Sequence, residues 1–274
     1  DKAWSLGVPR FLDLFDEVGC AGSFYCVASD LDDAVPRTII QEITARGHEV
    51  GNHTLDHNYR LTRLSDAEIY HQVAESRVRL ESAAGQPVVG FRAPGYHLNG
   101  TVLRAAQASG HIYDSSVFPC APYYLAKAGI MGMMQLRGRA SKSLLGTPQA
   151  LLAPRKPYQA DYFKPYQRDE GQGFSEFPIS VMGGVPLIGT AFTAMGASLS
   201  KLVVRTALRA HQHLTIEFHA ADLLSIVEDE LDPALSVQPD LSVSWLRKRE
   251  IYAKTLNLVH RYASYKRLDE MVGR

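Results

Sequence analysis

The chain has 274 residues, of which 46% are hydrophobic and 21% charged, as is usual for a globular protein. Its 29 basic and 29 acidic residues give a formal net charge of zero, so no overall field favours binding to nucleic acid, and we expect none. The three cysteines are widely spaced and include no CxxC pair, and no apolar run approaches the roughly 18 residues of a membrane span.

Helical and strand patterns alternate along the chain, which predicts a parallel sheet with helices outside it. The expected helices cover residues 9–18, 38–46, 65–84, 101–109 and 242–262. The expected strands cover residues 22–27, 49–53, 88–91, 112–113 and 214–218. Ser65 and Glu68 form an S-x-x-E capping box at the start of the third helix.

The alternation stops between Phe118 and Pro178, a stretch that contains several prolines, glycines and paired tyrosines, and a strand pattern resumes at 177–181. A chain of this length can bury one large core. We therefore expect a single domain over residues 1–274, with an insertion at about 119–178 that lies over the mouth of the site.

His53 and His57 are the first candidates for chemistry, because they lie four residues apart directly after an apolar strand. On a helical turn, this spacing places both imidazoles on one side, where they can bind one divalent ion. Two histidines at this spacing also occur by chance, so the pair requires a nearby carboxylate ligand before it indicates a metal site.

Four ordered motifs extend this pattern. They are RGHEVGNHTLDH at 46–57, GFRAPGY at 90–96, YDSSVFP at 113–119 and EFHAAD at 217–222. Together they resemble the motifs of the polysaccharide deacetylase family, also known as carbohydrate esterase family 4 or the NodB-homology domain. The resemblance implies an α/β fold, a distorted (β/α) barrel with its site at the carboxyl ends of the strands. Some of the motifs also resemble the branch that acts on lipid-linked amino sugars or on exopolysaccharide.

The resemblance implies an enzyme, a metal-dependent hydrolase that removes an N-acyl group, acetyl or formyl, from an amino sugar in a polysaccharide or lipid-linked glycan. His53, His57 and Asp1 would bind one divalent ion, with zinc expected first and cobalt, manganese or nickel as alternatives. Arg92 would hold the general-base carboxylate, and the backbone N–H of Gly95 or Tyr96 would stabilise the oxyanion. His219 would be the general acid. Asp114 would accept a hydrogen bond from it and raise its pKa.

The sequence departs from the family pattern at two positions. The family has an Asp-Asp or Asp-x-Asp motif, whose first carboxylate is the base and whose second binds metal, whereas here only Asp1 is present. Its distance from His53 favours the metal-binding role, and the base would then precede it. The rival assignment makes Asp1 the base and leaves the metal one ligand short. Glu217 stands where the family prefers an apolar residue.

Each assignment has an alternative. Arg92 could be a turn residue in a surface salt bridge, Asp114 could cap a helix or turn, and His219 could be a core histidine, with Asp222 as a second candidate to orient it. For the whole chain, the alternatives are a hydrolase of small cyclic amides and a non-catalytic glycan-binding barrel that lacks the base.

The segment 122–158 contains six basic residues, no acidic residue and many apolar ones. The basic residues are Lys127, Arg137, Arg139, Lys142, Arg155 and Lys156. We expect a lid whose charges meet water; the alternative is peripheral contact with anionic lipid or a polyprenyl phosphate. The sequence does not fix the location; a bacterial-type cell envelope or the cytoplasmic face of the membrane is expected ahead of secretion.

Overall fold

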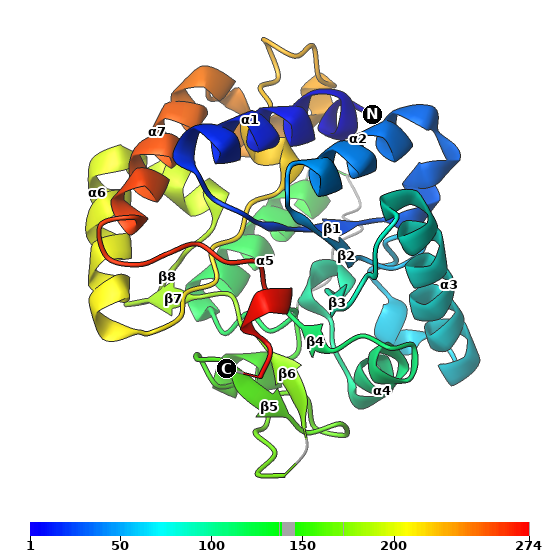
Figure 1. The fold of residues 1–274 in the computed structure, drawn as a ribbon. Coiled ribbons are helices and arrows are strands. Elements are labelled where there is room, and N and C mark those ends of the chain that lie inside the picture. The colour runs from blue at the N-terminus through cyan, green and yellow to red at the C-terminus, as the bar shows by residue number, and fades with distance from the viewer. Residues whose placement is uncertain (137, 139–145, 172, 274) are drawn as a thin grey trace. The chain divides into compact units, whose positions relative to one another are not determined.

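The structure, a computed structural model, describes residues 1–136, 138, 146–171 and 173–273 (Figure 1). The chain divides into two compact units. Residues Gly22–Ile179 and Lys266–Arg274 form what we call the sheet unit, and residues Asp1–Ala21 and Ser180–Tyr265 form the helical unit. Within the described ranges, no helix has both the length and the apolar character that crossing a membrane requires.

The sheet unit contains a six-stranded sheet with the order β1-β2-β3-β4-β6-β5. Its strands are β1 (Ser23–Cys26), β2 (Glu49–Asn52), β3 (Gly90–Phe91), β4 (Tyr113–Asp114), β5 (Tyr158–Ala160) and β6 (Phe174–Glu176). All neighbours pair in parallel except β5 and β6, which are antiparallel. The α/β alternation predicted from the sequence is confirmed. Because β1 to β4 and β6 run in one direction, the residues that follow them meet at one edge of the sheet.

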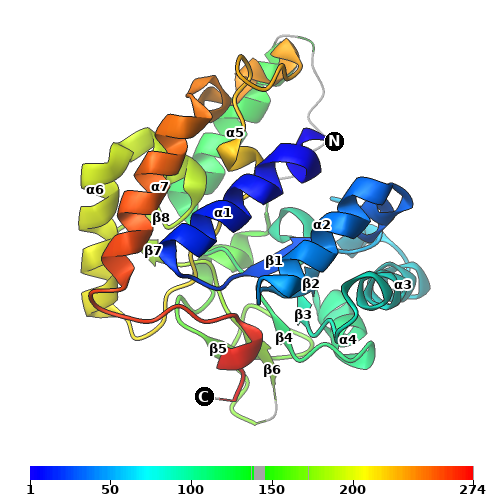
Figure 2. The same ribbon diagram turned by 45° about the horizontal axis from the view of Figure 1, so that its top comes forward.

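Four longer helices accompany this sheet. They are α2 (Ala34–Ala45), α3 (Asp66–Ala84), α4 (Gly100–Ala108) and α5 (Ala121–Leu136). α3 begins at the predicted capping box, in which the Glu68 carboxylate accepts a hydrogen bond from the Ser65 backbone N–H at 2.8 Å. The buried faces of α3 and α4 pack on the sheet through one apolar cluster that includes Val73, Phe91 and Leu103 (Figure 2). The burial of these two helix faces holds the sheet in place. It therefore also fixes the positions of the motif residues that follow the strands.

Two tyrosine rings lie against glycines of the neighbouring strand. Tyr25 is the register partner of Gly51, and Tyr113 is the partner of Gly90. A Cβ atom at either glycine would overlap the ring beside it. Tyr113 is fully buried, and its hydroxyl donates to the carboxylate of Glu49 at 2.9 Å, so the ring has little room to move. The sheet therefore requires glycine at both positions.

Several elements of this unit differ from the sequence-based expectation. The segment expected to be an irregular insertion contains the helix α5 and the strands β5 and β6, which extend the sheet beyond β4. The strand expected at 177–181 lies earlier, at Phe174–Glu176. No residue of α5 is buried, so α5 lacks the apolar stripe that marks a packed helix in a sequence.

The helical unit consists of three long helices, two short strands and several short helical turns. The helices are α1 (Val8–Val18), α6 (Gly189–Ala210) and α7 (Trp245–Val259), and the strands are β7 (Val181–Met182) and β8 (Val185–Pro186). α7 packs against both α1 and α6 (Figure 2). The sequence did not predict α6, which is interrupted at Gly196, where φ is +70°. The strand expected at 214–218 is reduced to one bridge, between Glu217 and Ile188.

Candidate active site

The two motif histidines lie together in the loop that follows β2. The ring centroids of His53 and His57 are 4.7 Å apart, and the ring planes meet at 64°. The residues after Asn52 form a loop rather than the expected helical turn. Thr54 and His57 adopt left-handed backbone conformations in it, with φ of +69° and +55°. The two rings therefore lie together because of these loop conformations, and not because residues four apart share one side of a helix.

Buried Asn52 fixes the start of this loop. Its side-chain amide donates to the Val73 carbonyl of α3 at 2.9 Å, and its carbonyl oxygen accepts from Thr54 N at 2.8 Å and from Ser76 Oγ at 2.6 Å. The Thr54 carbonyl in turn accepts from Ala28 N at 3.1 Å, after the end of β1. The loop is therefore anchored to both α3 and the neighbouring strand, which is the rigid support that a binding site needs.

A contact to Arg92, the first residue of the Arg-x-Pro motif (Arg92-Ala93-Pro94), sets the orientation of the His53 ring. His53 Nδ1 lies 2.7 Å from the Arg92 carbonyl oxygen. Because a carbonyl can only accept, Nδ1 carries the proton in this contact, and Nε2 carries the lone pair that a metal needs. The arrangement therefore suits the two imidazoles to act as two of the ligands of one divalent ion.

Among the residues that the structure describes, no third metal ligand is grouped with His53 and His57. In the described part of the chain, no group of three or more His, Cys, Asp or Glu side chains is arranged to hold a metal. Asp1 lies in the helical unit, where its side chain is exposed and its Oδ1 accepts from Ala3 N at 2.8 Å. Its assignment as a metal ligand stays a prediction.

Arg92 is buried and its guanidinium is fixed on three sides. Nε donates to the Ser115 carbonyl at 2.7 Å, and Nη2 donates to Ser115 Oγ at 2.7 Å. The guanidinium carbon lies 4.4 Å from the centroid of the Tyr25 ring, a cation–π contact. Burial excludes the alternative of a surface salt bridge. A fixed cation at the strand edge suits the predicted role of holding a carboxylate.

The turn after Arg92 has two successive residues in the left-handed region, Gly95 at φ +63° and Tyr96 at φ +66°. The ring of Tyr59 lies so close to Gly95 that a Cβ atom there would overlap it, and Tyr59 also meets His57 edge-on, with centroids 4.8 Å apart. Of the four non-glycine residues with positive φ that the structure describes, three are at this site: Thr54, His57 and Tyr96. Such conformations cost about 1–3 kcal/mol each and concentrate at functional sites.

Asp114, the last residue of β4, is fully buried. Its Oδ1 accepts from Ser116 Oγ at 2.5 Å. Its register partner on β6 is Glu176, which is also fully buried. Burial raises the pKa of both carboxyl groups, and the charge of Arg92 opposes that shift. Asp114 is thus a buried carboxyl group in the core of the sheet unit, and it is paired in register with Glu176 of β6.

His219 lies in the helical unit and is exposed, which excludes the alternative of a core histidine. It precedes a short 3₁₀ turn (Ala220–Leu223), and its backbone N–H donates to Asp222 Oδ2 at 2.8 Å. Burial raises the pKa of Asp222 to about 6, against the influence of the nearby His219. The second candidate for orienting His219 is therefore in direct contact with it. The pairing of His219 with Asp114 stays a prediction.

A match to a protein-family profile covers the part of the chain that contains the two histidines of the motif at 46–57. Residues 1–113 match the profile described as polysaccharide deacetylase. The chain is therefore similar to the polysaccharide deacetylase family over its first 113 residues. The region includes His53, His57, Arg92, Gly95 and Tyr96, and the resemblance inferred from the motifs is confirmed.

Two proteins illustrate the similarity. A peptidoglycan-N-acetylglucosamine deacetylase from Bacillus cereus is 27% identical over 105 residues, which are 38% of this chain. The chain thus spans about half, 46%, of the length of that curated relative. A crystal structure of a candidate polysaccharide deacetylase from Mycobacterium smegmatis is 18% identical, with a TM-score of 0.59 over 98% of this chain and 76% of the other. That likeness shows a shared fold, and the predicted fold class, the distorted barrel of the deacetylase type, is confirmed.

The deacetylase-type residues are thus divided between the two units. The sheet unit brings together His53, His57, Arg92 and the turn at Gly95 and Tyr96 through contacts between the segments that follow neighbouring strands. The helical unit holds Asp1 and His219. Sequence reasoning missed Tyr59, Asn52 and Glu176. Asn52 and Tyr59 flank the two histidines in the chain, and Glu176 is an acidic residue within an apolar run, which was the signal for its burial.

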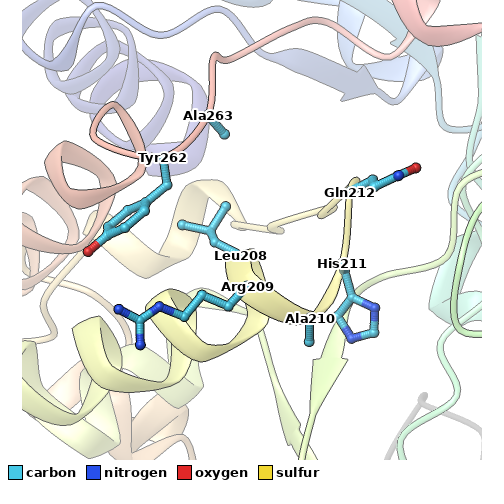
Figure 3. A pocket seen from close by; sticks show the side chains of 7 residues that line it. All are labelled: Leu208, Arg209, Ala210, His211, Gln212, Tyr262 and Ala263. Carbon is cyan, nitrogen blue, oxygen red and sulfur yellow. The ribbon is translucent and has the colours of Figure 1, made fainter.

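A pocket in the helical unit contains none of these residues (Figure 3). It is lined by the end of α6 and by the residues after α7, namely Leu208, Arg209, Ala210, His211, Gln212, Tyr262 and Ala263. It lacks the carboxylates and paired imidazoles of the deacetylase motifs, so we do not assign the substrate to it.

Proposed function

We propose that this protein is a metal-dependent deacylase that removes an N-acyl group, acetyl or formyl, from an amino sugar of a glycan. The observation that carries the proposal is the pair of imidazoles 4.7 Å apart, with His53 Nδ1 held by the Arg92 carbonyl at 2.7 Å. Metal-binding histidines are commonly oriented by such a hydrogen bond from the ring nitrogen that does not bind the metal. The name of the Bacillus cereus relative, a deacetylase of peptidoglycan N-acetylglucosamine, supports the same reaction and suggests the substrate class.

Each residue then has a defined role. His53, His57 and Asp1 would bind the ion, zinc first and cobalt, manganese or nickel as alternatives, and a bound ion would supply an activated water and stabilise charge on the acyl oxygen. Arg92 holds the base carboxylate in its ionised form. The N–H of Gly95 or Tyr96 donates to the developing oxyanion. His219 gives its proton to the sugar nitrogen as the carbon–nitrogen bond breaks, because an amine anion is too poor a leaving group to depart unprotonated.

The test is release of acetate from N-acetylated peptidoglycan fragments and chitin oligosaccharides by the full natural protein. We expect acetate release by the metal-loaded protein, its loss after chelation, and its recovery when zinc or cobalt is restored, because the ion supplies the nucleophilic water. Dialysis against metal-free buffer without chelator is the control. Glycan binding without acetate release would favour the non-catalytic glycan-binding barrel. Ring-opening hydrolysis of small cyclic amides, without acetate release from glycans, would favour the cyclic-amide hydrolase.

We also propose that the substrate is presented at an anionic membrane surface, as a lipid-linked sugar would be. α5 has no buried residue, and Leu125 and Leu136 are 73% and 90% exposed. Arg155 and Lys156 are exposed as well, while Arg137, Arg139 and Lys142 of the predicted basic segment lie outside the described residues. Exposed apolar side chains with cations nearby are the features that bind a protein to the interface of an anionic bilayer.

We expect the protein to co-sediment with vesicles that contain anionic lipid, and to be released as salt rises, because each Lys or Arg near the surface contributes about 1 kcal/mol and salt screens that attraction. Neutral vesicles are the control for apolar adsorption. An Arg155→Gln, Lys156→Gln double variant should bind less and keep its acetate release. Equal binding to neutral vesicles, or to neither kind, would make the segment a lid without a membrane role.

A further inference from the structure

Two carboxyl groups face each other inside the sheet unit, and neither belongs to the metal motif. Asp114 of β4 and Glu176 of β6 are register partners, and both side chains are fully buried. Among the described residues, Asp114 Oδ2 and Glu176 Oε2 are buried oxygens that accept no hydrogen bond from an N–H or hydroxyl group. Two buried carboxylates in direct contact cannot both stay ionised, whereas one carboxylic acid donating to one carboxylate satisfies both oxygens.

The surroundings decide which group keeps the proton. Asp114 accepts from the Ser116 hydroxyl at 2.5 Å, which favours the anion. Burial and the charge of Asp114 raise the pKa of Glu176 well above its ordinary value. Arg92 is the cation whose field reaches both groups, while the hydroxyls of Tyr158 and Tyr166 have raised pKa values and stay neutral. Ionised Asp114, neutral Glu176 and cationic Arg92 therefore balance to zero charge.

This pair is connected to the turn that follows Arg92. Ala93 N donates to Ser116 Oγ at 2.7 Å, and Ser116 Oγ donates to Asp114 Oδ1. On the other side, Val117 N donates to Glu176 Oε1 at 2.9 Å. A hydrogen bond from Glu176 to Asp114 would join these contacts into one chain, which leads through Ser116 to the backbone of the turn at Ala93. Each donor in that chain is used once, so its direction is fixed.

We propose that Glu176 is a protonated positioning residue, which donates a hydrogen bond to Asp114 and so fixes the chain through Ser116 to Ala93. The consequence for catalysis rests on the proposed deacylase function, because that chain ends at the turn assigned to the oxyanion. The shared proton itself is independent of any activity. Removing the donor would leave Asp114 with a buried, unsatisfied oxygen and loosen the turn.

The proton can be observed directly by infrared spectroscopy of the full protein labelled with ¹³C-glutamate. We expect a C=O stretching band of a protonated carboxyl group at pH 9, where the carboxyl group of Glu49, whose pKa burial raises to about 7, is ionised. This band should shift on labelling and disappear in Glu176→Gln. The exposed glutamate of Glu170→Gln serves as the matched control and should leave the band in place. A spectrum without a protonated glutamate, or a band that survives Glu176→Gln, would overturn the proposal whether or not the protein is a deacylase.

The positioning role is tested by turnover. Glu176→Gln keeps an acceptor for Val117 N and gains an amide N–H that can donate to Asp114, so we expect kcat within about 3-fold of the wild type. Glu176→Ala lacks the donor and should lower kcat about 10- to 100-fold, the range that a hydrogen bond to a charged group contributes, with KM and metal content unchanged. Equal losses in both variants would contradict the donor role. If Glu176→Ala does not fold, a large kcat loss in Glu176→Gln alone would overturn it.

Discussion

Replacing His53 with alanine is expected to abolish stoichiometric metal binding and to lower deacylase activity by more than about 100-fold. Losing a residue that only hydrogen-bonds to a metal ligand already costs up to about 100-fold, and His53 would bind the metal itself. The Arg92 carbonyl oxygen, 2.7 Å from Nδ1, fixes the tautomer of His53. Without it, His57 alone cannot retain a divalent ion through dialysis. Metal content is measured by elemental analysis of dialysed protein, and activity by acetate release.

The matched control is His71→Ala, because His71 is an exposed histidine on α3 of the same unit. That variant should keep both metal and activity, which separates loss of a ligand from loss of any histidine. Unfolding curves in urea should show that His53→Ala remains folded. One metal ion per chain retained by His53→Ala would contradict the site.

Replacing His219 with alanine is expected to lower turnover by roughly 10²–10⁴, the usual contribution of a general acid, while metal content is unchanged. The exposed imidazole of His219 can reach a substrate, and the contact of its backbone N–H with Asp222 fixes the residue in place. The expected loss concerns the step in which the sugar nitrogen departs, since that atom must be protonated. Acetate release from an N-acetylated oligosaccharide measures it.

An ester substrate with an activated phenolate leaving group provides the sharper comparison. Such a leaving group departs without a proton, so His219→Ala should lose far less activity on the ester than on the amide. His213→Ala, an exposed histidine six residues earlier, is the control and should leave both activities intact. Equal losses on ester and amide would show that His219 supports the structure of the site and does not act as the acid.

The sequence predicted those parts of the fold and site that depend on local pattern. His53 and Arg92 were placed correctly at strand ends, because apolar runs of β2 and β3 precede them and parallel strands end at one edge. The partnership of Asp114 with Glu176 could not be predicted, because it depends on β6 joining β4 across a segment without regular pattern. The left-handed conformations of Thr54 and His57 were equally hidden, since positive φ is uncommon for any residue other than glycine and especially for a β-branched one such as threonine.

The tyrosine–glycine pairs between neighbouring strands have a consequence for how this protein can evolve. Tyr25 occupies the space over Gly51, and Tyr113 occupies the space over Gly90, so each pair shares one fixed volume. A larger residue at position 90 is compatible with the sheet only if position 113 becomes smaller, and the same holds for positions 51 and 25. The single changes should be harmful and the double changes tolerated. Each pair therefore behaves as one epistatic unit, and the two members should vary together among related sequences.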